Sequence, residues 1–258
     1  MINTKNRENL YLYLTKKDKL TPVKSLLEKK GYVMRLEDGK LVPRLPSVGY
    51  DAPWVYVQAA DAARCDLYTT VFFKTLNWIH SYCRECYKVV ARPKTVVDLF
   101  KLYELQREMG VPCKCGLERR NTVCGLYGGY FYNRGFEQGK RRYKQVRELV
   151  DERLSPDTPV ILKRYCTEME TCSYDPNDVP QGPSNETPDV TKEEREWELE
   201  VEAMFPKVGF GNKQPDWLIA NRMREWIHYA YQQGDLSYKE LTGGSDLFPH
   251  YVTYHDGE

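Results

Sequence analysis

Apolar residues in the middle of the chain follow strand and helix periods in turn. Val89 and Val90 lie in a strand-like run, whereas Val96, Leu99 and Phe100 recur at helical spacing behind a Thr95 cap. The whole stretch predicts strand, helix, strand, strand, helix and strand at 87–92, 95–109, 113–119, 122–132, 136–154 and 159–165. This order is typical of the split βαβ, or ferredoxin-like, arrangement. We therefore predict an α+β protein with a ferredoxin-like βαββαβ core over residues 66–172, entered through a helix at 66–82.

The flanking segments have different patterns. Residues 1–65 predict an N-terminal appendage: a helix capped by Thr21, a hairpin turning at Asp38-Gly39, and a short strand at 54–57. Residues 173–192 are polar and rich in proline, which is typical of a linker. Residues 193–258 predict an acidic helical segment with its main helices at 191–205 and 215–233.

Composition indicates a soluble globular protein, because 41% of the residues are hydrophobic and 29% are charged. The sequence lacks an apolar run of about 18 residues, so we expect no membrane helix. The first residues do not resemble a signal peptide, and we expect a cytoplasmic location. In that compartment the eight cysteines favour metal ligands or buried thiols over disulfides.

Charge is unevenly distributed along the chain. Residues 83–167 contain 18 Lys and Arg against 10 Asp and Glu, whereas residues 168–258 contain 7 against 19. A basic body followed by an acidic tail indicates an anionic partner, or a tail that folds back onto the body. Segregated but solvated surface charge explains the same pattern.

Four cysteines form the clearest candidate site. Cys83-x2-Cys86 is followed, after 26 residues, by Cys113-x-Cys115. The predicted topology starts both strands at one edge of the sheet, which would bring four thiolates together. Four thiolates suit a structural zinc ion or, alternatively, an iron–sulfur cluster. Unmetallated core thiols remain a third possibility, and His80, Cys124 or Cys166 are substitutes for one of the four.

A second candidate site follows in residues 125–134, where Tyr130 and Tyr132 lie among glycines. This strand resembles the aromatic strand of RNA recognition motifs, and the resemblance implies base stacking on its rings. Lys140, Arg141 and Lys144 on the next helix are placed to follow a phosphate backbone. The alternatives are tyrosines packed beneath another element and a solvated basic helix.

Enzyme motifs are scarce. The sequence lacks a Walker loop, Gly-x-Ser-x-Gly and His-Glu-x-x-His, and only Glu168 and Glu170 suggest acid–base chemistry. The leading prediction is therefore a zinc-containing module that binds RNA or DNA, alone or as a subunit of a larger assembly. The alternatives are an iron–sulfur or other metal-dependent enzyme, and a structural subunit that docks a protein partner through its C-terminal helices, Trp217 to Trp226.

Overall fold

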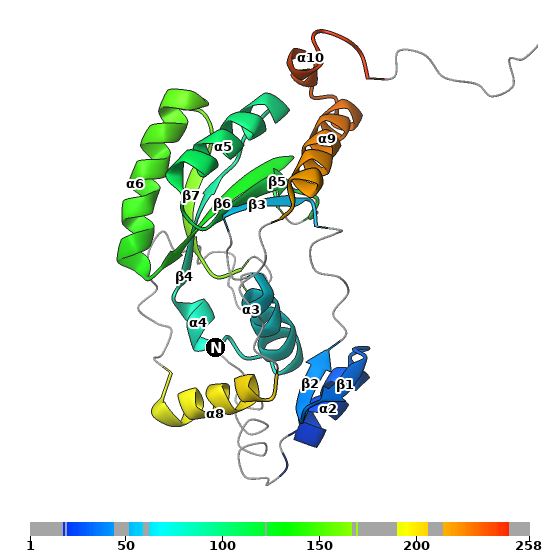
Figure 1. The fold of residues 1–258 in the computed structure, drawn as a ribbon. Helices are drawn as coiled ribbons and strands as arrows, with labels where there is room; N and C mark the ends of the chain where they lie inside the picture. The colour runs from blue at the N-terminus through cyan, green and yellow to red at the C-terminus, as the bar shows by residue number, and fades with distance from the viewer. Residues whose placement is uncertain are drawn as a thin grey trace, which may run out of the picture.

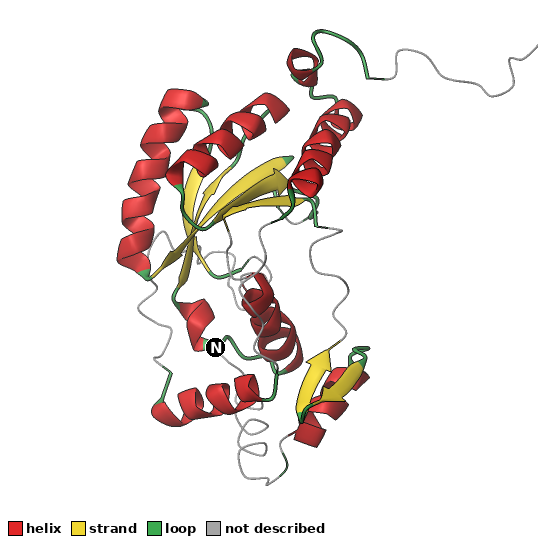
Figure 2. Cartoon of the chain, viewed as in Figure 1, coloured by secondary structure: helices red, strands yellow, loops and turns green. Residues whose placement is uncertain are grey.

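The structure is a computed structural model, and it describes residues 18, 20–43, 52–58, 62–121, 123–166, 169, 190–205 and 214–247. Its class is mixed α+β with antiparallel sheets, which confirms the predicted class (Figure 2). A five-stranded sheet with its helices forms one part of the molecule. A smaller two-stranded sheet with further helices forms the other (Figure 1).

The large sheet has the strand order β3-β5-β6-β4-β7, and every neighbouring pair is antiparallel. The strands are β3 (Trp54–Gln58), β4 (Cys86–Ala91), β5 (Cys113–Leu117), β6 (Tyr127–Arg134) and β7 (Val160–Arg164). β3 comes from the stretch assigned by sequence to the N-terminal appendage, yet it pairs with β5 as an edge strand. The sheet therefore extends beyond residues 66–172.

Helices cover one face of this sheet. α5 (Val96–Met109) and α6 (Phe136–Arg153) lie across it, and α9 (Asp216–Gln233) packs near β3 and β5, followed by α10 (Tyr238–Leu241) (Figure 1). The core between the layers includes fully buried Leu99, Phe131 and Trp226. The C-terminal helices thus complete this core.

Local sequence signals set the ends of α5. The Thr95 side chain accepts from the backbone N–H of Asp98 at 3.1 Å, as a helix N-cap does. Gly110 ends the helix in the left-handed region at φ 59°. α5 also approaches β6 closely at Gly129. A Cβ atom at this position would lie 2.4 Å from a Leu102 methyl group, so glycine permits this approach.

The second part of the molecule has its own core. It contains α2 (Leu20–Lys29), the hairpin of β1 (Met34–Glu37) and β2 (Lys40–Pro43), α3 (Ala62–Leu67), the π-helix η1 (Tyr68–Thr75), α4 (Ser81–Arg84) and α8 (Lys192–Ala203). The hairpin is confirmed, with Asp38 and Gly39 both at positive φ. The predicted Thr21 cap is wrong, because the Asp18 carboxylate accepts from the first backbone N–H groups of α2.

The predicted helix at 66–82 is interrupted. After η1 the chain leaves helical geometry at Asn77, which has φ 53°, and it resumes only in the short α4. The backbone N–H of Leu76 still donates to Val71 five residues back, so the helix widens before it ends. Two separate segments therefore approach β4, and α4 leads directly into it.

No helix among the described residues is both long and apolar enough to cross a membrane. Most of the predicted linker, and the candidate acid–base residues Glu168 and Glu170, lie outside the described residues.

Candidate functional site

The sheet face opposite α5 and α6 combines aromatic and cationic side chains. Strand register aligns one row of residues across all five strands, and alternation places this row away from the helices. The row is Tyr56, Lys114, Tyr130, Val90 and Ile161. We call this surface, with the neighbouring Trp54, Lys88, Arg92, Tyr132 and Lys163, the open face because α5 and α6 do not cover it, although Val90, Tyr130 and Lys88 are buried.

Cations of the open face lie over aromatic rings. The Lys114 Nζ lies 4.5 Å from the Trp54 ring centroid and 5.4 Å from that of Tyr130. Lys88 has the same relation to Tyr132, at 5.5 Å. Ring quadrupoles attract such cations. The open face therefore combines cationic groups with aromatic rings.

One buried carboxylate organises the end of this face. Glu118 is 3% exposed and accepts from the Tyr130 hydroxyl at 3.0 Å and from Arg120 Nη2 at 2.6 Å. Arg92 Nη1 lies 3.3 Å from the same carboxylate. Burial alone would raise the pKa of Glu118, but the hydrogen bonds and charge of Arg120 lower it to about 2. Glu118 is thus ionised at neutral pH and fixes two guanidinium groups.

A cavity of about 630 Å³ opens beside β4 and β7. Arg92, Lys94 and Lys163 contribute to its lining, together with Ile161 and the loop of residues 123–126. Among the residues that the structure describes, none that lines the cavity is Asp or Glu. Lys94 is exposed, and Ile161 is 47% exposed. This arrangement suits a ligand that is anionic and partly apolar.

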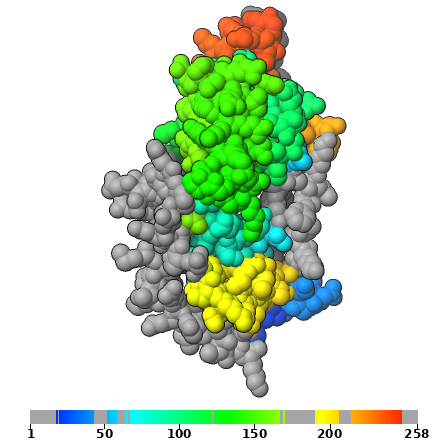
Figure 3. Space-filling view, turned by 90° about the vertical axis from the view of Figure 1, so that its left-hand side faces the viewer, coloured from blue at the N-terminus to red at the C-terminus, as the bar shows by residue number. Residues whose placement is uncertain are grey.

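The structure separates the two halves of the predicted nucleic-acid site. Tyr130 and Tyr132 lie on the open face, at 3% exposure and half-buried respectively. Lys140, Arg141 and Lys144 are exposed on α6, which covers the opposite face. Figure 3 shows α6 at the molecular surface above α8. One surface therefore does not contain all five predicted residues.

Sequence reasoning did not select Arg92 and Lys94, which flank Pro93 at the end of β4. The sequence feature that could have identified Arg92 is the alternation of Lys88, Val90 and Arg92, because it places Lys88 and Arg92 on one face of the strand. That signal becomes informative only when the opposite face is known to be covered by helices.

Three of the four predicted metal cysteines lie in two different cores, and the fourth, Cys86, is partly exposed at the start of β4. Cys113 and Cys115 are fully buried in the core beneath α5, whereas Cys83 belongs to the second core. Burial raises the pKa of Cys113 to about 12, so this thiol is protonated at neutral pH. Burial also raises the pKa of Cys83, and Cys166 raises it further.

Sheet register explains this separation. β6 lies between β4 and β5, pairing Cys86 with Arg134 and Cys113 with Phe131. Two strand spacings of about 4.8 Å and an offset of three residues of about 3.3 Å each therefore separate Cys86 from Cys113. Zinc–sulfur bonds of about 2.3 Å require much closer sulfur atoms. In the described part of the chain, no group of three or more His, Cys, Asp or Glu side chains is arranged to hold a metal ion.

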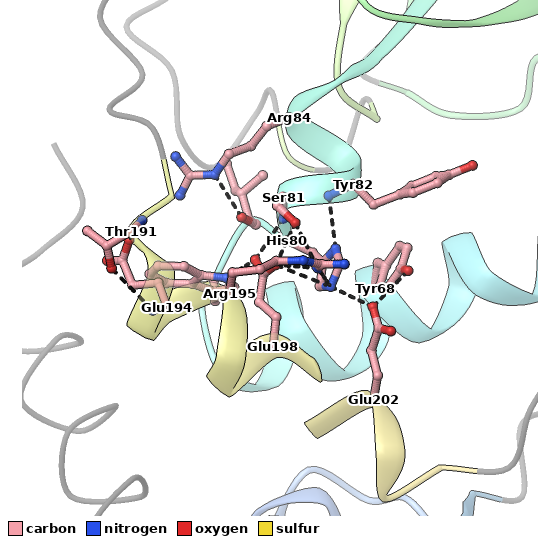
Figure 4. A network of polar contacts seen from close by, with 12 residues as sticks. Tyr68, His80, Ser81, Tyr82, Arg84, Thr191, Glu194, Arg195, Glu198 and Glu202 are labelled. Carbon is pink, nitrogen blue, oxygen red and sulfur yellow. Dashed lines mark hydrogen bonds and ion pairs between the residues drawn. The ribbon is translucent and has the colours of Figure 1, made fainter. Parts of the chain in front are cut away.

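A buried polar network lies in the second core (Figure 4). His80 is fully buried, and its Nδ1 accepts from the backbone N–H of Tyr82 at 3.0 Å. The proton therefore belongs on Nε2, which lies 2.7 Å from the Glu202 carboxylate. The ring also stacks on Tyr68 at 3.9 Å between centroids. These contacts make His80 a structural residue.

Glu198 occupies the centre of this network. Its buried carboxylate accepts from Trp78 Nε1 at 2.8 Å, from the Ser81 backbone N–H at 2.7 Å and from Arg195 Nη1 at 2.8 Å. Glu198 and Arg195 both belong to α8, so these bonds fasten that helix to the segment before β4. The full set of donors indicates a structural role for the carboxylate.

The C-terminal helices divide their tryptophans between core and surface. Trp226 of α9 is fully buried against Phe100, at 5.4 Å between ring centroids. Trp217, at the start of the same helix, is 56% exposed. Of the two, only Trp217 offers surface for a protein partner.

No family model, curated protein or solved structure matches this chain.

Proposed function

We propose that this protein binds a single nucleic-acid strand, with phosphates in the cavity beside β4 and β7 and bases against the accessible groups Ile161 and Tyr132. The cavity supports the proposal most directly, because three cationic side chains, Arg92, Lys94 and Lys163, contribute to its lining. Cations that replace the counterions of a phosphate backbone supply most of the affinity in nonspecific nucleic-acid binding.

The surroundings of the cavity favour a single strand over a duplex. Ile161 is 47% exposed beside the cations, and Tyr132 is partly exposed on the same face. Unpaired bases pack on such flat or apolar groups, whereas duplex bases are already stacked. Tyr130 is 3% exposed and bonded to Glu118, so its assigned role is to support the face.

We also propose that β4 to β7 with α5 and α6 form a ferredoxin-like core. The strand order β5-β6-β4-β7, its antiparallel neighbours and the two crossover helices on one face support this assignment. The open face then corresponds to the face that aromatic strands occupy in RNA recognition motifs.

Fluorescence anisotropy with labelled single-stranded RNA and DNA tests the binding. Three phosphate contacts predict a slope of about −2 for the logarithm of the association constant against the logarithm of salt concentration. Lys94→Gln and Lys163→Gln should each weaken binding and reduce that slope by about 0.7. Lys94 is exposed, so its substitution should leave the fold unchanged.

A matched control uses the other basic surface. The triple variant Lys140→Gln, Arg141→Gln and Lys144→Gln removes the same kind of charge from α6, and we expect it to bind almost as tightly as the wild type. Loss of binding in this triple variant, with normal binding by the cavity variants, would move the site to α6. Absence of binding to any oligonucleotide at low salt would refute the proposal.

A further inference from the structure

Lys88 is a buried lysine with an unusual partner. It is 5% exposed, and its Nζ lies 2.9 Å from the Cys166 sulfur. The same Nζ lies 5.5 Å from the centroid of the Tyr132 ring. A buried ammonium group is costly unless an opposite charge accompanies it. The Cys166 sulfur is the group at hydrogen-bonding distance from this ammonium.

The backbone around Cys166 supports this contact. Tyr165 ends β7 at φ 68°, in the left-handed region that aromatic residues rarely occupy. The next residue, Cys166, is partly exposed and is directed to Lys88. A local strain of about 1–3 kcal/mol is typical of such a conformation, and here it accompanies the lysine–sulfur contact.

A second thiol lies close to this pair. Cys86 precedes Lys88 by two residues on β4, so both side chains are on one face of the sheet. The backbone N–H of Tyr165 donates to the Cys86 carbonyl at 3.0 Å, which makes Cys86 and Cys166 near neighbours across the β4–β7 pair. Disulfides need Cα atoms about 4.4–6.8 Å apart, a spacing available between adjacent strands.

We propose that Cys166 is a peroxide-sensitive thiolate activated by Lys88, and that Cys86 resolves its oxidised form as a disulfide. The Cys166 sulfur attacks one oxygen of hydrogen peroxide and breaks the O–O bond. Sulfur thereby becomes a sulfenic acid, and the second oxygen leaves as water after taking a proton. The Cys86 sulfur then displaces the sulfenic hydroxyl, which also leaves as water. In total, two thiols and one peroxide give one disulfide and two waters, with two electrons transferred from sulfur to oxygen.

The chain provides an internal reference for the first test. Cys124 is exposed and therefore more accessible to solvent than Cys166. After brief treatment of the reduced wild-type protein with limiting hydrogen peroxide, nonreducing peptide mapping should recover Cys166 joined to Cys86, with Cys124 still reduced. Faster oxidation of Cys124, or a disulfide from Cys166 to Cys83, would overturn the assignment.

Variants test the role of Lys88. In a Cys86→Ser background the sulfenic acid persists, and its trapping by dimedone reports the rate of the first step. Lys88→Met removes the charge and should slow trapping at Cys166 about tenfold or more, whereas Lys88→Arg should retain most of the rate. Equal rates in the Met and Arg variants, both folded by circular dichroism, would refute activation by the ammonium group. The wild-type peptide map decides the proposal if the Met variant does not fold.

Discussion

Truncation of Glu198 to alanine should destabilise the protein more than any surface substitution in α8. The change leaves the Trp78 indole N–H and the Ser81 backbone N–H without an acceptor inside the second core. Each orphaned buried donor costs about 1–3 kcal/mol, so the two together cost about 4 kcal/mol. Arg195 is largely able to rehydrate, because its side chain is 44% exposed.

The conservative variant Glu198→Gln separates hydrogen bonding from charge. An amide retains an acceptor for Trp78 and Ser81 but places N–H groups against Arg195, where the carboxylate accepts now. We expect the free energy of unfolding to fall by about 1–2 kcal/mol, which is less than for the alanine variant. Glu196 is an exposed glutamate of the same helix, and Glu196→Ala should change stability by less than about 0.5 kcal/mol.

Urea unfolding at 25 °C, followed by both tryptophan fluorescence and far-ultraviolet circular dichroism, measures these free energies. Coincident transitions establish two-state behaviour, without which the free energies are undefined. If Glu198→Ala costs less than about 1 kcal/mol in a two-state transition, the network does not fasten α8, and the reasoning is refuted.

Two further predictions concern the acid titration of Glu118 and the effect of a metal chelator on stability. Glu118 has a pKa of about 2 in the folded protein against 4.5 ordinarily, so its ionised form adds stability above pH 4.5 that is lost as pH falls towards 2. Glu118→Gln should therefore flatten the acid limb of the urea midpoint against pH, and an unchanged limb would contradict the assignment. Because Cys113 and Cys115 pack in the apolar core, EDTA should leave the melting temperature of the purified protein unchanged; a fall of several degrees would indicate a metal staple.

Signals contained within a few residues predicted local structure well. Asp38-Gly39 predicted the hairpin, because two positive φ angles are required in its turn. Thr95 and Gly110 similarly predicted both ends of α5. These features depend on backbone conformation and nearby hydrogen bonds, which the local sequence determines almost alone.

Features that depend on distant partners were harder to predict. The pairing of β3 with β5 joins segments more than 50 residues apart, and the short run Trp54–Gln58 does not specify its neighbour. The candidate site shows the same limit. Tyr130 lies in the predicted strand, but the cations beside it come from β4, β5 and β7 and not from α6. The prediction combined Tyr130 with the cations of α6 because α6 follows β6 in the sequence. The pairing of the strands, however, determines which side chains share a face of the sheet.

The short segment between η1 and β4 links the two cores physically. Ser81 is bound by Glu198 of α8, and five residues later the chain enters the sheet at Cys86. Arg84, 6% exposed, donates to the Ile79 carbonyl, and its own carbonyl accepts from Arg164 at the end of β7. The position of α4 therefore determines how the ends of β4 and β7 meet, which is where Lys88 and Cys166 come into contact. A disulfide formed there would act on the same segment that α8 holds in place, so oxidation and the docking of α8 are expected to influence each other through α4.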